Sequence, residues 1–157
     1  MTRNLHFEVE YPYPPEQVWQ ALTQREALAL WLMPNDFAPI VGHRFQFHTK
    51  PAPGFDGIVQ CEVLEVLPPT RLVYTWIGGG VDTTLTWTLK RNVNGTQLML
   101  DHNGFEGLRG LFVSKILGSG WNSRILRKNL PALLERWTGV GPISYAPATT
   151  CRKEEEQ

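Results

Sequence analysis

Histidine and acidic residues are the side chains in this sequence that could move protons or orient a polar ligand. His102 shares one face of a predicted strand with Leu98 and Leu100, so it should point into an apolar interior. A neutral imidazole there can donate or accept a hydrogen bond and so orient a ligand carbonyl or phenol. The alternative is a histidine satisfied by the protein itself, and the sequence leaves both interpretations open.

The carboxylates near this strand do not form an acid–base pair by spacing. Asp101 is adjacent to His102 and should therefore face the opposite side of the strand, in solvent. Glu62 and Glu65 are an odd number of positions apart, which predicts opposite faces and at most one inward carboxylate. We expect both glutamates to be exposed.

Motifs for other kinds of chemistry are not found. The four histidines lie on separate segments without helical i, i+4 spacing, so no metal site is predicted. No Gly-x-Ser-x-Gly turn supports a nucleophilic hydrolase. Gly78-Gly-Gly is not followed by a helix or by the Gly-Lys-Ser/Thr of a phosphate loop. We therefore expect no cofactor and assign no catalytic residues.

Length and composition exclude several classes of protein. A chain of 157 residues, 42% of them hydrophobic, suits one domain with a sizeable core. Lys+Arg and Asp+Glu each number 15 and no basic stripe occurs, which argues against nucleic-acid binding. The sequence contains no apolar run of about 18 residues, so no membrane span is predicted. Without an apolar leader, and with only Cys61 and Cys151, the chain is expected to be cytoplasmic with reduced thiols.

Alternating hydrophobicity and turn signals predict the elements that position these residues. Strands are expected over 5–9, 44–48, 58–67, 71–77, 84–89 and 96–102. Two short helices should follow the first strand, the first opened by Pro14 and Pro15 and the second ended by Pro34. Tight turns between most of the strands favour an antiparallel sheet.

The last predicted element is a long helix that begins near Gly120. Its apolar stripe consists of Trp121, Ile125, Leu126, Leu130, Leu133, Leu134 and Trp137. Pro131 lies inside this stripe and should bend the helix or cost it a hydrogen bond. This helix must cover the concave face of a curved six-stranded sheet, which gives an α+β fold. We expect one domain over residues 1–137 and a tail over 138–157.

Several segments, in order, resemble the START/birch-allergen-like (SRPBCC) superfamily. They are Pro14-Pro-Glu-Gln-Val-Trp-Gln-Ala-Leu-Thr, Gly42-His-Arg-Phe-Gln-Phe, Pro68-Pro-Thr-Arg-Leu-Val-Tyr-Thr-Trp, Thr96-Gln-Leu-Met-Leu-Asp-His-Asn-Gly-Phe and Gly120-Trp. The resemblance covers about residues 5 to 137 and is to the branch named for the activator of heat-shock-protein-90 ATPase homologue. It implies a helix-grip fold with a ligand cavity between the sheet and the long helix.

With this resemblance, we interpret the inward aromatic residues as the walls of a pocket for a small hydrophobic molecule. The predicted pocket residues are Trp31, Phe45, Phe47, Tyr74, Trp76, Trp87, His102, Phe105, Trp121 and Ile125. Removing a tryptophan from a packed core costs about 3–5 kcal/mol. If the residues line a cavity, Trp76→Ala and Trp87→Ala should both cost distinctly less.

The apolar connection over 106–119 departs from the family pattern, and it leaves three functions open. It could form a helical lid over a bound molecule, which fits a binding protein. An enzyme acting on a polyketide-like or aromatic substrate would instead use His102 with Tyr74 or an inward glutamate. A co-chaperone, a regulatory domain or a homodimer would expose the same apolar segment to a protein partner.

Overall fold

The computed structural model describes residues 2–140, with side chains described as far as residue 136. The elements are β1 (Thr2–Tyr11), α1 (Pro15–Thr23), α2 (Arg25–Trp31), β2 (Arg44–His48), β3 (Ile58–Leu67), β4 (Arg71–Gly78), β5 (Val81–Asn92), β6 (Gly95–Glu106), α3 (Gly107–Ser119), η1 (Gly120–Asn129) and α4 (Leu130–Val140). The predicted strands and short helices are all present; β2 and β3 have their predicted bounds, and the other four strands are longer than predicted.

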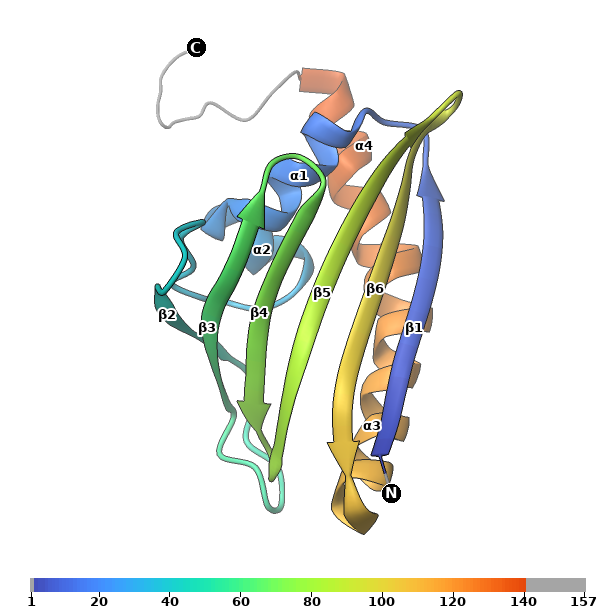
Figure 1. Ribbon diagram of the computed structural model, residues 1–157. Helices are drawn as coiled ribbons and strands as arrows, with labels where there is room; N and C mark the ends of the chain where they lie inside the picture. Colours follow the sequence, from blue (N-terminus) through green and yellow to red (C-terminus); the bar gives the residue numbers. More distant parts are fainter. Residues whose placement is uncertain (1, 141–157) are drawn as a thin grey trace.

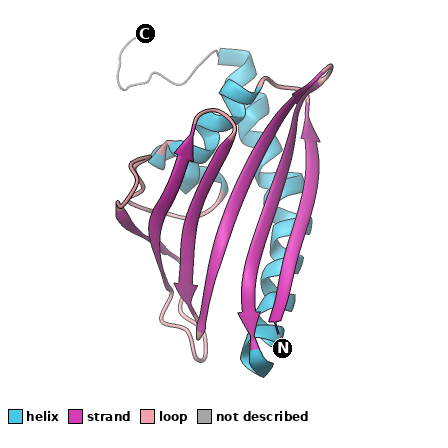
Figure 2. Ribbon diagram, in the orientation of Figure 1, coloured by secondary structure: helices cyan, strands magenta, loops and turns pink. Residues whose placement is uncertain are grey.

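The strands form one antiparallel sheet in the order β1-β6-β5-β4-β3-β2. The sheet is curved, and the C-terminal helix runs along its concave side behind β6 and β1 (Figure 1). The short helices lie on the same side of the sheet, with α2 behind β3 and β4 and α1 packed on β5 and β6 (Figure 2). The α+β helix-grip fold predicted from the sequence is therefore confirmed.

Two bulges reset which side chains face the core, and one of them corrects a prediction. In β3 the register shifts between Val63 and Glu65, so the extra residue returns Glu65 to the outer face that Glu62 already occupies. The two glutamates therefore lie on the same face, not on opposite faces. Both are half-exposed and pair with arginines, Glu62 with Arg44 at 3.7 Å and Glu65 with Arg71 at 3.1 Å.

The second bulge lies where β6 pairs with β1, and it needs a glycine. The register shifts between Arg3 and Asn4, which leaves Gly104 as the extra residue, with φ of 105°. The Asn4 side chain accepts a hydrogen bond from the Gly104 amide at 3.0 Å. The shift turns Phe105 inward, where it is buried against Leu5 and Val81.

The long helix is longer than the sequence predicted, because it begins at Gly107 and not near Gly120. The helical segments α3, η1 and α4 follow one another without a break. Gly120 and Leu130, where they meet, both have right-handed helical backbone angles. The apolar connection over 106–119 is therefore mainly the first third of this helix. Of the predicted stripe, Trp121, Leu126, Leu130, Leu133 and Leu134 are all buried. The predicted tail begins at residue 138, whereas α4 continues to Val140. The side chain of Trp137 and residues 141–157 of that tail lie outside the described residues.

Pro131 is the second residue of α4, just beyond the π-helical segment η1, in which each amide bonds five residues back. The Leu130 amide bonds to the Ile125 carbonyl in this register, and the next amide would reach the carbonyl of Leu126. Pro131 has no amide hydrogen. The Leu126 carbonyl instead accepts a hydrogen bond from the Tyr11 hydroxyl at 2.5 Å, which ties the end of β1 to the helix.

Candidate functional site

An apolar cavity of about 260 Å³ lies between α3, the loop over 49–57 and the turn over 78–80. Its apolar lining comes from Met33, Ala52, Pro53, Phe55, Val59, Trp76, Phe112, Val113, Ile116 and Leu117. Thr49, Gly78, Gly79 and Arg109 complete the lining. Small-molecule sites are mostly apolar, with a few polar groups at defined places, and this composition fits that description.

A second hollow of about 380 Å³ continues from this cavity toward the middle of the helix. The two hollows share Met33, Thr49, Trp76, Ile116 and Leu117, so we treat them as one groove. The inner end of the groove is lined by the π-helical segment, through Gly120, Trp121, Arg124, Ile125 and Asn129. Short π-helical stretches occur frequently at functional sites.

Arg109 holds the mouth of the groove together. Its Nε donates to the Gly79 carbonyl and its Nη2 donates to the Gly54 carbonyl, each at 2.8 Å. Gly54 and Gly80 both have positive φ, and a Cβ at either position would lie within 3 Å of the arginine side chain. The two glycines therefore provide both the turns and the room that let one guanidinium tie α3 to two loops.

The structure divides the predicted pocket residues into two groups. Trp76, Trp121 and Ile125 line the groove. The other seven, which line neither hollow, are Trp31, Phe45, Phe47, Tyr74, Trp87, His102 and Phe105. These seven are buried and pack mainly on one another, as in the edge-to-face pairs Trp31–Trp87 at 5.9 Å and Phe45–Tyr74 at 5.2 Å between ring centroids. The interior beneath the groove is thus filled with side chains.

His102 points toward the helix, as predicted, but both of its ring nitrogens bond to protein groups. The Trp121 indole donates to Nδ1 at 3.2 Å, so Nδ1 is the acceptor and Nε2 carries the hydrogen. Nε2 then donates to the Thr83 hydroxyl at 2.8 Å, and that hydroxyl donates to the Trp76 carbonyl at 2.7 Å. The chain of hydrogen bonds satisfies every buried member, which favours the structural interpretation of this histidine.

The buried titratable groups are held in their neutral forms. Burial lowers the pKa of His102 to about 3. Burial also raises the pKa of the Tyr74 hydroxyl well above its usual range, and this hydroxyl accepts a hydrogen bond from the Trp87 indole at 3.1 Å. Neither group lines the groove, so the arrangement does not present them to a bound molecule.

Several residues of the groove were not predicted from the sequence. Met33, Phe55 and Arg109 lie in or beside loops and helix ends, where no periodic pattern indicates which way a side chain points. A signal did exist for Phe112 and Ile116, because the apolar connection over 106–119 was unusual for its family. These two side chains remain 64% and 56% exposed, at the outer wall of the groove.

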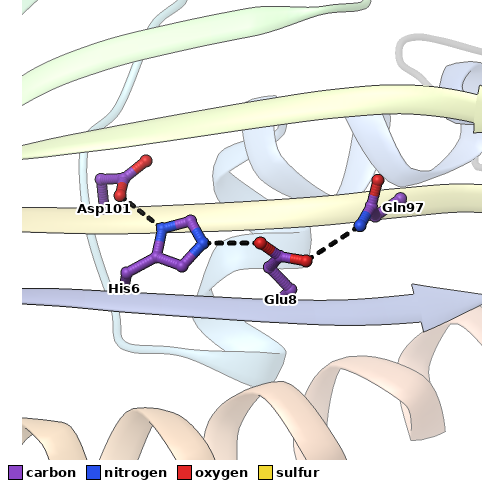
Figure 3. A network of polar contacts seen from close by, with 4 residues as sticks. All are labelled: His6, Glu8, Gln97 and Asp101. Atoms are coloured by element: carbon purple, nitrogen blue, oxygen red, sulfur yellow. Dashed lines mark hydrogen bonds and ion pairs between the residues drawn. The ribbon is translucent and has the colours of Figure 1, made fainter.

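A polar network lies on the opposite, outer face of the sheet. His6 bonds through Nδ1 to Asp101 at 2.6 Å and through Nε2 to Glu8 at 2.8 Å, while Gln97 donates to Glu8 at 3.0 Å (Figure 3). Hydrogen bonds to Glu8 and Asp101 raise the pKa of His6. Asp101 faces away from His102 as predicted, and its role is to join β6 to β1.

The described residues contain neither a metal-binding cluster nor a membrane-spanning helix. Among the described residues, no group of three or more histidine, cysteine or acidic side chains could hold a metal ion. Within residues 2–140, no helix is long and apolar enough to cross a membrane. A hollow of about 520 Å³ beside the end of β1 is lined by Glu10, Glu135, Arg127 and Lys128 among others, and its mixed charges make it a poorer site for an apolar molecule.

Comparison with solved structures finds the same fold in bacterial proteins. Protein MLL2253 from Mesorhizobium loti is 34% identical with a TM-score of 0.77, over 85% of this chain and 98% of that one. Protein BH1534 from Bacillus halodurans is 28% identical with a TM-score of 0.70, over 85% and 99% of the two chains. DynU16, a protein of the dynemicin biosynthetic locus, is 25% identical with a TM-score of 0.67, over 88% of this chain and 48% of that one.

The sequence itself was compared with known proteins and families. No protein with a curated description matches the chain. Residues 12–138, most of the chain, match the family described as Activator of Hsp90 ATPase homolog 1-like protein. The order of elements and the helix-grip fold agree with this match, as does the resemblance found in the sequence. The chain therefore belongs to the family of Activator of Hsp90 ATPase homolog 1-like proteins, within the SRPBCC-like fold.

Proposed function

We propose that the protein binds a small hydrophobic molecule in the groove between the long helix and the 49–57 loop. The observation that carries this proposal is the groove itself, which joins two hollows and is lined mainly by apolar side chains. Phe112 and Ile116 are large apolar side chains that stay mostly exposed at its wall. Covering them with a ligand would remove apolar surface from water, at about 25 cal/mol per Å².

The proposed site differs from the pocket expected from the sequence. Seven of the predicted pocket residues fill the space between sheet and helix, so the ligand is proposed to lie closer to the mouth. Trp76 and Trp121 form the inner wall there, and Met33 and Phe55 lie on the loop side. Arg109 ties α3 to the two loops that border the mouth.

Binding is better supported than catalysis. A general acid or base must come within hydrogen-bond reach of the reacting group. His102 and Tyr74, the candidates for that role, are buried away from the groove and already hydrogen-bonded to protein groups. The similarity to DynU16 of the dynemicin biosynthetic locus is compatible with handling of a small organic molecule.

The test is saturable binding of a neutral apolar fluorophore, N-phenyl-1-naphthylamine, followed by fluorescence titration. The wild-type protein should bind the probe, and Ile116→Trp should weaken binding at least fivefold because the larger side chain narrows both hollows. Leu108→Trp is the matched control. Leu108 lies on the same helix, is 87% exposed and lines neither hollow, so this variant should bind like the wild type.

Two outcomes would overturn the proposal. One is the absence of saturable binding to the wild-type protein. The other is equal binding by Ile116→Trp and the wild type, which would place the probe elsewhere. Thermal unfolding of both tryptophan variants shows whether they are folded. Native mass spectrometry before and after denaturation would also identify any molecule that purifies with the protein, and it would report the oligomeric state.

A further inference from the structure

The charged residues of the groove all have the same sign. Arg109 lines the outer cavity and Arg124 lines the inner hollow, and no aspartate or glutamate lines either one. The chain as a whole has a formal net charge of zero, with acidic and basic residues equal in number. An apolar groove with two cations and no anion in its walls is therefore a local departure from the composition of the molecule.

Neither cation is neutralised by the protein. Among the described residues, no carboxylate lies within ion-pair distance of Arg109 or Arg124. The two acceptors of Arg109 are carbonyl oxygens, which satisfy hydrogen bonds but leave the positive charge in place. By contrast, Arg44, Arg71 and Arg91 each pair with a glutamate on the surface.

Arg109 is also held in place at the mouth, which matters for recognition. Its Nε and Nη2 bonds to two loops fix the plane of the guanidinium, and Gly54 and Gly80 lie against it without side chains. A fixed cation loses little side-chain entropy when it binds an anion. Charge-assisted hydrogen bonds from arginine to a carboxylate are about twice as strong as neutral ones.

The geometry points to a ligand with an apolar body and one acidic group, with the acidic group at Arg109. This inference rests on the proposed function and specifies its ligand class. The apolar body would follow the groove along the helix toward Arg124, which is fifteen residues further on and about 20 Å away. A carboxylate or a similar anion at the mouth would stay partly hydrated while the apolar chain is buried.

The experiment compares decanoate with decan-1-ol as competitors that displace N-phenyl-1-naphthylamine. The two molecules share an apolar chain and differ in the acidic group. The wild-type protein should bind decanoate at least fivefold more tightly than the alcohol. Arg109→Gln should remove this preference, because it should weaken the binding of decanoate at least fivefold more than the binding of the alcohol. Arg109→Lys keeps the charge but not the paired bonds to the loops, so it should retain part of the preference.

Lys115→Gln is the matched control, because it removes one positive charge from the same helix at a residue that lines neither hollow. This variant should keep the preference for decanoate. Equal affinity of the wild type for acid and alcohol would overturn the inference and leave the proposed function intact. A loss confined to Arg124→Gln would overturn the placement at Arg109. Equal losses for both competitors in Arg109→Gln would show that the arginine only holds the loops.

Discussion

Trp76 and Trp87 lie on neighbouring strands and face the same side of the sheet, but their surroundings differ. Trp87 is fully buried, donates to the Tyr74 hydroxyl and packs edge-to-face on Trp31 and Trp121. Trp76 packs on Phe47 and Trp121 on one side and lines both hollows of the groove on the other. The sequence predicted both as pocket residues, whereas in the structure Trp87 belongs to the packed core and Trp76 lines the groove.

Truncating these two tryptophans should therefore have unequal effects. Trp87→Ala removes a fully packed side chain, and the free energy of unfolding should fall by about 3–5 kcal/mol. Trp76→Ala should cost distinctly less, because one side of the ring already borders a cavity. Urea unfolding of the two variants measures the difference. Equal losses would mean that Trp76 is packed as completely as Trp87 and that the groove does not reach it.

At the scale of elements, the contact between β1 and the helix depends on Tyr11 and the missing amide of Pro131. Helix carbonyls that lose their partner need another one, since an unsatisfied buried polar group costs about 1–3 kcal/mol. The Tyr11 hydroxyl is the new partner of the Leu126 carbonyl. Burial raises the pKa of this hydroxyl above its usual range. The local defect of the helix thus becomes a link between the first and last parts of the fold.

A double-mutant cycle tests this link. Tyr11→Phe should lower the free energy of unfolding by about 1–3 kcal/mol, because the Leu126 carbonyl then has no donor. In the Pro131→Ala background the new amide can bond to that carbonyl, so the same change should cost less. Urea unfolding of the four proteins gives the coupling energy. Additive effects would show that Pro131 and Tyr11 act independently.

The outer side of α3 is the other element with an open role. Leu108, Phe112 and Ile116 recur every four residues and are 87%, 64% and 56% exposed, while Gly110 and Ser114 face the sheet. The proposed ligand would cover Phe112 and Ile116 only in part. A homodimer or a protein partner using this stripe is one of the alternatives that the sequence leaves open, and it stays a prediction.

At the scale of the whole molecule, His102 and His6 change the free energy of unfolding in opposite directions as the pH falls. Burial lowers the pKa of His102 to about 3, below the value near 6.5 that it has when unfolded. The unfolded chain therefore takes up the proton first, and stability falls as the pH drops below 6.5. The pKa of His6 is raised, so its contribution is complete below pH 6.5 and is lost as the pH rises through the raised value.

The free energy of unfolding should therefore decrease from pH 7 to pH 5 by about 2 kcal/mol through His102 alone, at about 1.4 kcal/mol per pH unit below 6.5. His102→Leu should show a flatter dependence over this range. His6→Gln should show a steeper one, by less than about 1 kcal/mol because His6 is half-exposed and its pairs are screened. Urea unfolding at both pH values checks this. A wild-type stability that is unchanged between them would contradict the neutral, buried His102.

The sequence by itself determined the fold of this protein and the order of its elements. Alternation with a period of two, helical spacing, and prolines and glycines at the ends of elements are local signals that need no partner. They predicted the six strands, the two short helices and the inward direction of His102, all of which the structure contains. They also predicted the apolar stripe of the long helix, which is buried among its described side chains except at the half-buried Ile125.

Only the tertiary structure decided which inward residues border open space. The bulges at Leu64 and Gly104 change the face of the sheet to which Glu65 and Phe105 point. These bulges depend on how neighbouring strands pair. Whether Trp76 or Trp87 lines a cavity depends on the volume left between segments far apart in the chain. Arg109 likewise forms hydrogen bonds to Gly54 and Gly79, which are 55 and 30 residues away in the sequence. Packing and hydrogen bonding depend on which residues meet in the folded protein, and the pattern along one strand does not specify those residues.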